Sequence, residues 1–244
     1  MDKLKVLDLF SGIGGFSLGL ERTGEFETVA FCEIEKAPSK VLALRYPNTP
    51  IYKDVRKLDG RQVGAVDLIC GGFPCQDISS AGNQSGIGED TRSGLFREML
   101  RLAGECGRPL ILFENVSRLL SGPEEKNGAW FWEFLWSLAQ IGYDAEWFCI
   151  TAASLGAAHE RDRIWIVAYP NETQLERGGI SSRVYEKHAE FSDTCRGQDK
   201  PGVVRTLDGV PNQMDRLGML GNAVFPDIPE LIGRAIIEAE RASL

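Results

Sequence analysis

Short apolar runs alternate with longer amphipathic stretches over most of the chain, and this alternation limits the folds open to it. The runs that predict strands are Leu4–Leu9, Thr28–Cys32, Val66–Cys70, Pro109–Phe113, Tyr143–Thr151 and Arg163–Tyr169. The stretches that predict helices are Ile13–Arg22, Ala37–Tyr46, Gly94–Cys106, Ala129–Gln140 and Pro226–Arg241. Strand–helix alternation is typical of an α/β fold with a mostly parallel sheet and helices on both faces.

The composition fits a globular chain without a membrane span. The chain has 244 residues, 43% apolar and 25% charged, enough for one domain with a small insert. No apolar run reaches the roughly 18 residues of a membrane helix, and the N-terminal run lacks a signal-peptide pattern, so we expect a cytoplasmic protein. The formal net charge of −8 argues against a generally cationic surface but leaves room for a local nucleic-acid groove.

Residues 170–212 differ from the rest of the chain because they are polar and show little periodicity. They predict a small irregular subdomain or a long functional loop. Apolar residues at helical spacing return only in the last predicted helix.

A glycine-rich turn, Asp8–Phe16, follows the first predicted strand. Glycines there allow close backbone approach to a ligand, although a tight strand–helix turn alone explains them equally well. Glu33 at the end of the second strand suits ribose hydroxyls, and Asp54 is placed to meet an adenine edge. The turn lacks a third spaced glycine and a Gly-Lys-Ser/Thr, so S-adenosylmethionine is favoured over NAD or ATP.

One of six cysteines has an unusual setting. Cys75 follows Pro74 at the start of a long polar loop, whereas the other cysteines lie near apolar runs or in ordinary polar contexts. A loop thiolate can add to an electron-poor carbon, although burial as an inert thiol is the alternative. With two histidines and no Cys-x-x-Cys, no metal site is expected.

Several ordered blocks together resemble the motifs of the DNA (cytosine-5)-methyltransferases. The blocks are Asp8–Phe16, Gly71–Ser79, Thr91–Phe96, Glu114–Val116, His159–Arg163 and Gly221–Val224. The resemblance covers nearly the whole chain except about 170–205. It implies a Rossmann-like methyltransferase fold with a small irregular target-recognition insert.

The resemblance implies a catalytic group of four residues. Cys75 would attack C6 of cytosine, and Glu114 would donate to N3, which requires a carboxyl group that holds or shares a proton. Of Arg161 and Arg163, the second would hold the cytosine O2 and favour the thiolate. The alternatives are a strand-end cap for Glu114 and an ion-paired edge-strand face for the arginines.

The resemblance also implies a cofactor site for S-adenosylmethionine, whose product is S-adenosylhomocysteine. Its residues come from the glycine turn, the ends of the next strands, the cysteine loop and the C-terminal block. They are Phe10, Gly12, Ile13, Gly15, Glu33, Ile34, Asp54, Val55, Pro74, Leu95, Asn222 and Ala223.

Duplex DNA is the implied substrate, and its cytosine must be flipped out because the stack hides C5 and C6. Loop contacts would come from Gln76, Ser79, Gln84 and Arg92. Candidate base readers are Arg177, Arg183, Lys187 and Arg196, each of which could equally be a solvated loop charge.

We therefore expect a catalytic domain over 1–169, a reduced target-recognition region over 170–205 and a returning segment over 206–244. The expected enzyme is a monomeric prokaryotic or phage DNA methyltransferase, which can share a restriction-modification system with a nuclease that it does not bind. Two alternatives are a tRNA cytosine-5 methyltransferase and a weakly active or partner-dependent DNA-binding remnant.

Overall fold

The described residues form one seven-stranded sheet in the order β3-β2-β1-β4-β5-β7-β6. The computed structural model describes residues 2–74, 92–121, 128–157, 162–173, 179–195 and 223–242, with the backbone alone at 92, 93 and 191–195. The strands are β1 Leu4–Leu9, β2 Phe26–Cys32, β3 Ile51–Tyr52, β4 Leu68–Gly72, β5 Leu110–Val116, β6 Tyr143–Thr151 and β7 Asp162–Pro170. The first five are parallel, and β7 runs antiparallel to both β5 and β6.

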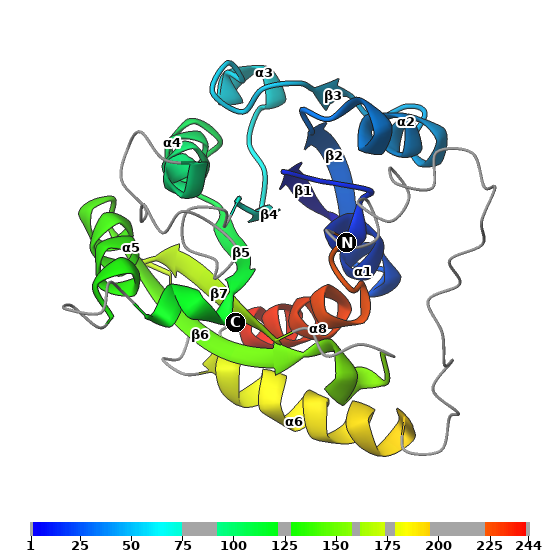
Figure 1. The fold of residues 1–244 in the computed structure, drawn as a ribbon, viewed down its shortest axis with the longest axis vertical. Helices are drawn as coiled ribbons and strands as arrows, with labels where there is room; N and C mark the ends of the chain where they lie inside the picture. The colour runs from blue at the N-terminus through cyan, green and yellow to red at the C-terminus, as the bar shows by residue number, and fades with distance from the viewer. Residues whose placement is uncertain are drawn as a thin grey trace.

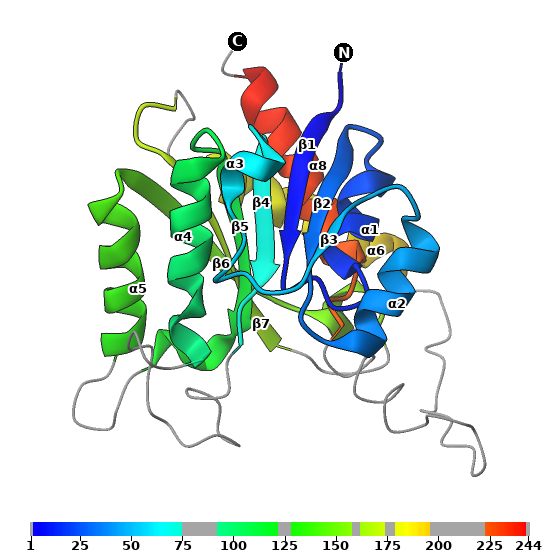
Figure 2. The ribbon, with the colours of Figure 1, turned by 90° about the horizontal axis from the view of Figure 1, so that it is seen from above.

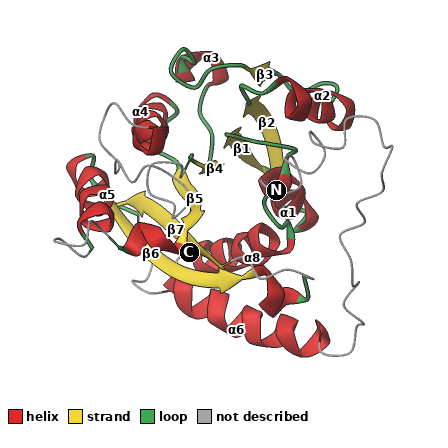
Figure 3. Ribbon diagram, in the orientation of Figure 1, coloured by secondary structure: helices red, strands yellow, loops and turns green. Residues whose placement is uncertain are grey.

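Helices cover both faces of this sheet, as Figure 1 shows. The α-helices are α1 Gly15–Arg22, α2 Lys36–Arg45, α3 Gly60–Val63, α4 Phe96–Glu105, α5 Ala129–Gln140, α6 Gly179–Cys195 and α8 Asp227–Ala242. Three short 3₁₀ turns are η1 Arg92–Leu95, η2 Ser117–Leu120 and η3 Ala152–Leu155. Figure 3 shows the strands as a continuous layer between the helices. The predicted α/β fold with a mostly parallel sheet is confirmed.

The two faces of the sheet carry separate apolar cores. On one face α4 and α5 pack through Phe96, Met99 and Phe134 against strand residues such as Leu7 and Phe113. On the other face α1, α8 and α6 pack against β7 and its neighbours. Because both faces are covered, the central strands are apolar along most of their length, which explains the unbroken apolar runs of the sequence.

The last helix joins the first one, so the two ends of the described chain belong to one fold. α8 places Ile228, Leu231 and Ile232 in the core that contains Phe16 and Leu20 of α1. Ion pairs flank this contact, with Arg22–Asp227 at 2.6 Å and Arg241–Glu25 at 2.9 Å. The expectation that the C-terminal segment returns to the N-terminal fold fits this packing.

The expectation of an irregular segment after residue 170 is wrong over residues 179–195, which form α6. Over 179–190, where the structure describes the side chains of this helix, Ile180 and Val184 are the only fully buried apolar residues, so this stretch shows almost no helical periodicity in the sequence. Its N-terminus is fixed from outside, because Glu146 of β6 accepts a hydrogen bond from the Ser181 backbone N–H at 2.8 Å. The helix therefore depends on partners that lie far away in the sequence.

β5 also extends further than the sequence suggests, because Glu114 and Asn115 lie inside the strand rather than after it. Both residues pair with β7, Glu114 opposite Trp165 and Asn115 opposite Ile164. The polar pair is therefore held rigidly at the carboxyl ends of the central strands.

None of the described helices combines the length and apolar character that a membrane span requires.

Candidate active site

The turn after β1 is held in a strained conformation at the carboxyl edge of the sheet. Phe10 has a φ of 53° and Gly12 a φ of 54°, and a positive φ is unfavourable for a bulky side chain such as phenylalanine. Hydrogen bonds keep the turn in place, since Ser11 Oγ donates to the Asp8 carbonyl at 2.6 Å and the Gly14 N–H donates to Ser11 O at 2.8 Å. Such over-determined strain is typical of ligand-binding turns.

Asp8 supports the turn from beneath. Its side chain is fully buried, and its Oδ2 accepts hydrogen bonds from the Ser17 hydroxyl at 2.7 Å and the Ser17 N–H at 3.4 Å. Burial raises the pKa of this carboxyl to about 7, although the Ser17 hydrogen bonds oppose the shift. Asp8 therefore ties the strand end to the first turn of α1.

Glu33 joins the end of β2 to the glycine turn. Its two carboxylate oxygens accept hydrogen bonds from the N–H groups of Gly12 and Glu35, each at 2.7 Å. Burial raises the pKa of Glu33, and the two backbone hydrogen bonds act in the opposite direction. Each oxygen keeps a further lone pair, so the carboxylate can still accept from ligand hydroxyls.

Asp54, two residues after β3, is a charged acceptor on the same side. Arg56 donates to both of its oxygens at 2.9 Å, and these hydrogen bonds hold the pKa of the Asp54 carboxyl below its ordinary value. The side chain of Ile34 nearby is 64% exposed. An exposed apolar side chain beside a fixed acceptor suits a flat heteroaromatic ligand with an exocyclic amine.

These groups line one cavity of about 670 Å³ at the carboxyl ends of the central strands. That volume lies in the usual range for sites that hold a small molecule or cofactor. Its walls come from the turns after β1, β2 and β3, from the ends of β4 and β5, and from the start of β7. The lining residues are Phe10, Gly12, Cys32, Glu33, Ile34, Glu35, Pro38, Lys53, Asp54, Val55, Arg56, Gly72, Phe73, Pro74, Leu95, Glu114, Asn115, Val116 and Arg163.

Glu114 and Arg163 form an ion pair on one wall of this cavity. Arg163 Nε lies 2.8 Å from Glu114 Oε1, and the two side chains are 23% and 11% exposed. Gly72 of β4 makes room for the carboxylate, because a Cβ at this position would lie 2.7 Å from Glu114 Oε2. The pair places an acid and a guanidinium side by side in a partly desolvated site.

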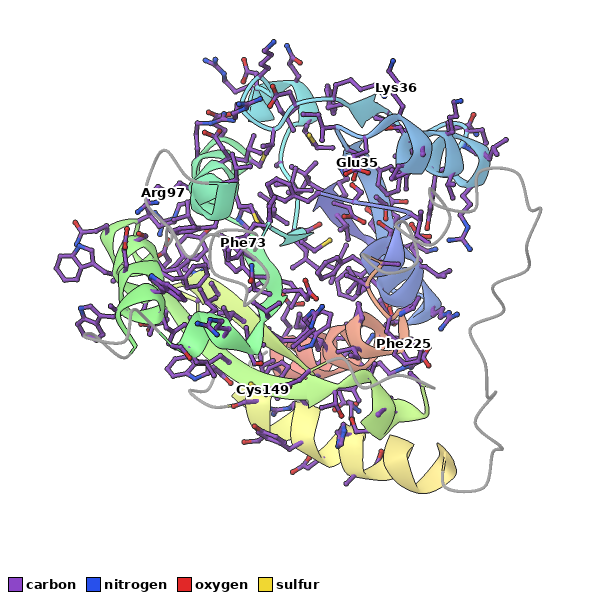
Figure 4. The ribbon with its side chains drawn as sticks, in the orientation of Figure 1. Glu35, Lys36, Phe73, Arg97, Cys149 and Phe225 are labelled. Atoms are coloured by element: carbon purple, nitrogen blue, oxygen red, sulfur yellow. The ribbon has the colours of Figure 1, made fainter. Side chains whose placement is uncertain are left out.

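Asn115 connects this wall to the segment that leads to Cys75. The residue is 2% exposed, and its Nδ2 donates to the Phe73 carbonyl at 3.0 Å. The Phe73 ring is buried among Phe96, Phe113 and Phe134. Figure 4 labels Phe73 beside α4 and β5, and Glu35 near β2 and α2, so the cavity wall draws on distant parts of the sheet. The backbone just before Cys75 is thus fixed by a ring cluster and one amide.

The described cysteines are poor nucleophiles. Burial raises the pKa of Cys32 to about 12 and that of Cys106 to about 11, and it raises the pKa of Cys70 and Cys149 as well. A thiolate at neutral pH is therefore disfavoured at each of them. No cluster of three or more His, Cys, Asp or Glu is placed to hold a metal ion within the part of the chain that the structure describes.

The structure brings ten of the predicted site residues together in one cavity. Phe10, Gly12, Glu33, Ile34, Asp54, Val55, Pro74, Leu95, Glu114 and Arg163 all line the cavity. The predictions for Cys75, Gln76, Ser79, Gln84, Arg161, Arg177, Arg196 and Asn222 fall outside the described residues, as does the side chain of Arg92.

Three predicted cofactor residues are described but do not line the cavity: Ile13, Gly15 and Ala223. Gly15 instead lets the segment before α8 approach the start of α1 closely, because a Cβ there would lie 2.5 Å from the Val224 carbonyl oxygen. The cofactor role of these three positions stays a prediction.

Two predicted base readers, Arg183 and Lys187, lie on α6 and bond within the protein. Lys187 Nζ pairs with Glu238 of α8 at 2.5 Å, and Arg183 donates to the Gly179 carbonyl at 2.7 Å. Figure 2 shows α6 behind the sheet, on the side of α1 and α8. Their role in reading bases stays a prediction, and the structure supplies each with an internal partner.

Several cavity residues were not predicted from the sequence. Lys53 and Arg56 line the cavity together with Asp54. The sequence Lys-Asp-Val-Arg, which places cations on both sides of this carboxylate, was the signal that could have indicated them. Gly72 and Asn115 stood inside motifs already singled out, but their roles depend on contacts between strands that no sequence pattern displays.

Comparison with known proteins identifies this arrangement. The model of the C-5 cytosine-specific DNA methylase family matches residues 4–216. The chain belongs to this family. The chain is 36% identical over 191 residues to the type II methyltransferase M.Sau3AI of Staphylococcus aureus, covering 72% of this chain and 46% of that protein.

A second relative agrees with this assignment, and a solved structure shares the fold. The chain is 33% identical over 208 residues to the type II methyltransferase M1.ScrFI of Lactococcus lactis subsp. cremoris, covering 85% of this chain and 49% of that protein. The S. pombe Dnmt2 methyltransferase shares the fold, with a TM-score of 0.56 at 18% identity over 81% of this chain and 56% of that one. The chain spans about half the length of the relatives that it matches.

Proposed function

We propose that this chain transfers a methyl group from S-adenosylmethionine to C5 of cytosine in duplex DNA. One observation carries the proposal: a single cavity contains both the Glu33 and Asp54 acceptors and the Glu114–Arg163 pair. A cofactor and a base bound in the same cavity would have their reacting atoms in contact. Family membership and the similarity to type II methyltransferases support the same activity.

The cavity residues fit S-adenosylmethionine. Of the residues that line the cavity, Glu33 would accept from the ribose hydroxyls, Asp54 would accept from the adenine amine, and Ile34 would pack on the adenine ring. Carboxylates among the lining groups suit a cationic sulfonium. When bound, S-adenosylmethionine supplies a methyl group activated by its positive sulfur.

The residues of the opposite wall fit a flipped cytosine. The Cys75 thiolate adds to C6, and the ring electrons move toward N3, where Glu114 supplies the proton. Arg163 holds O2 and, through its charge, favours the thiolate. C5 would then take the methyl group as the sulfonium S–CH3 bond breaks and S-adenosylhomocysteine is left. Loss of the C5 proton to solvent expels the Cys75 thiolate from C6, and return of the N3 proton to Glu114 restores neutral aromatic 5-methylcytosine. The raised pKa values of Cys32, Cys70, Cys106 and Cys149 support Cys75 as the nucleophile.

The test is incubation of the purified chain with labelled S-adenosylmethionine and unmethylated mixed-sequence duplex DNA, alongside tRNA, followed by bisulfite sequencing. We expect label in DNA and protected cytosines in a defined sequence context. Glu114→Gln should abolish the label, whereas Glu27→Gln, an exposed carboxylate on β2, should leave it unchanged.

Two outcomes would contradict the proposal. Label in tRNA alone would assign the chain to RNA. Cofactor binding without label in either nucleic acid would mean that this chain by itself does not act as a methyltransferase.

A further inference from the structure

Arg118 lies in the turn that follows β5, at the carboxyl edge of the sheet, and its side chain has no partner among the residues that the structure describes. Its side chain forms no hydrogen bond or ion pair with any described residue, and its Nε is buried without an acceptor. Every other arginine whose side chain the structure describes donates to an oxygen of the protein. A buried donor without an acceptor is rare in folded proteins and requires an explanation.

The position of Arg118 is fixed by its neighbours. It lies in η2, the 3₁₀ turn that directly continues β5, two residues after Val116 of the cavity wall. Leu119 beside it is fully buried in the core, and the Arg118 carbonyl accepts from the Ser121 N–H at 2.9 Å. The guanidinium therefore stands on a rigid turn at the carboxyl edge of the sheet.

The neighbouring cation on this edge is already engaged. Val116 pairs with Arg163 across β5 and β7, and Arg163 bonds to Glu114. Arg118 is thus a described guanidinium next to the base-binding wall that remains available to a ligand. A flipped cytosine that binds beside the Glu114–Arg163 pair stays attached to its DNA strand. The backbone phosphates of that strand therefore lie at the mouth of the cavity. Phosphate is the anion that a guanidinium binds most effectively, and phosphate contacts fix the position of a DNA strand.

We propose that Arg118 binds a backbone phosphate of the DNA strand that carries the target cytosine. This inference rests on the proposed function, since it assumes a cytosine in the cavity. It assigns DNA positioning to the body of the catalytic fold, where β5 ends, in addition to any segment that reads sequence.

The test is DNA affinity as a function of salt concentration, measured by fluorescence anisotropy for the wild type, Arg118→Gln and Arg241→Gln. Arg241→Gln is the matched control because it removes the same charge from an arginine that is paired with Glu25 near the start of β2, away from the cavity. Loss of one phosphate contact should reduce the slope of log K against log salt by about 0.9 and weaken binding about tenfold at low salt. Arg118→Lys should keep most of the slope.

S-adenosylmethionine affinity and melting temperature serve as checks on folding, and both should match the wild type in Arg118→Gln. If Arg118→Gln has the same salt slope and DNA affinity as Arg241→Gln while the wild type methylates DNA, the phosphate contact is refuted. If the wild type neither binds nor methylates DNA, the proposed function is refuted, and the phosphate contact that depends on it is refuted as well.

Discussion

The Glu33 end of the cavity, which we propose binds the cofactor, and helix α6 show opposite relations between sequence and structure. At the Glu33 end, the groups that hold the carboxylate come from the glycine turn and from the residues just after Glu33. In α6, the groups that hold the helix come from β6 and α8, far away in the chain. The first region was predictable from local residues, and the second was not.

This difference separates two kinds of site residue. A turn with fixed glycines and a following carboxylate largely determines its own geometry, so its chemistry can be inferred from the sequence. A charged residue in a polar segment acquires its role only from the partner that the fold brings to it. Arg183 and Lys187 have internal partners, whereas the side chain of Arg118, which no motif distinguished, has none in the described part of the chain.

The largest effect is expected at the nucleophile. Cys75→Ser should lower the methyl transfer rate by at least about 10⁴-fold, because a serine hydroxyl is a far weaker nucleophile than a thiolate. S-adenosylmethionine affinity, measured by calorimetry, should stay within twofold of the wild type. Cys149→Ser, at an exposed cysteine on β6, is the control and should keep full activity. Near-normal transfer by Cys75→Ser would show that another group attacks C6.

Asn115 should affect the methyl transfer rate because it positions the backbone that leads to Cys75. Asn115→Asp removes the donor to the Phe73 carbonyl, so the backbone before Cys75 loses its anchor. We expect kcat to fall about 10- to 100-fold with little change in cofactor affinity, since small misplacements of reacting groups cost this much. Asn171→Asp, at an exposed turn, is the matched control. A change confined to the S-adenosylmethionine dissociation constant would place Asn115 in the cofactor site instead.

Glu33 tests the proposed cofactor end of the cavity directly. In the wild type the Glu33 carboxylate accepts hydrogen bonds from two backbone N–H groups. Glu33→Gln replaces one of these acceptors with an amide NH₂, which is itself a donor and faces the backbone N–H. Loss of one charge-assisted hydrogen bond should weaken S-adenosylmethionine binding about 10- to 100-fold. Glu27→Gln on the same strand should bind normally. An unchanged dissociation constant in Glu33→Gln would refute the ribose assignment.

Asp8 predicts a pH dependence of stability. Its folded pKa of about 7 exceeds the ordinary aspartate pKa of 3.8, so the folded state binds more protons than the unfolded state between these two pH values. The contribution of Asp8 should be complete below about pH 4 and should be lost as the pH rises to about 7. Asp8→Asn, which stays neutral and can still accept from Ser17, should flatten this fall in melting temperature. Parallel curves for the wild type and the variant would contradict the assignment.

The smallest effect is expected on α6. Lys187→Gln removes a partly exposed pair with Glu238, so the free energy of unfolding should fall by less than about 1 kcal/mol. The methylated sequence context, read by bisulfite sequencing, should stay the same. A changed sequence context around the methylated cytosines would support Lys187 as a base reader. It would then contradict the contrast drawn between the Glu33 end of the cavity and α6.

Much of the fold and half of the site could be predicted from the sequence. Unbroken apolar runs indicated the central strands, because a sheet covered on both faces is apolar throughout. Glu114 was found from its motif, yet its ion pair with Arg163 depends on an antiparallel register between β5 and β7. Gly72 and Asn115 act through contacts across strands, and α6 has only two fully buried apolar residues over 179–190, where its side chains are described. These features depend on tertiary contacts and leave no local pattern.

The most direct test of the account is covalent trapping on a duplex that carries 5-fluorocytosine in the methylated context. Fluorine at C5 cannot leave as a proton, so the enzyme stays attached to C6 after methyl transfer. We predict a protein–DNA adduct that requires S-adenosylmethionine and that peptide mass spectrometry maps to Cys75. An adduct on another cysteine, or none from an enzyme that methylates ordinary DNA, would contradict it.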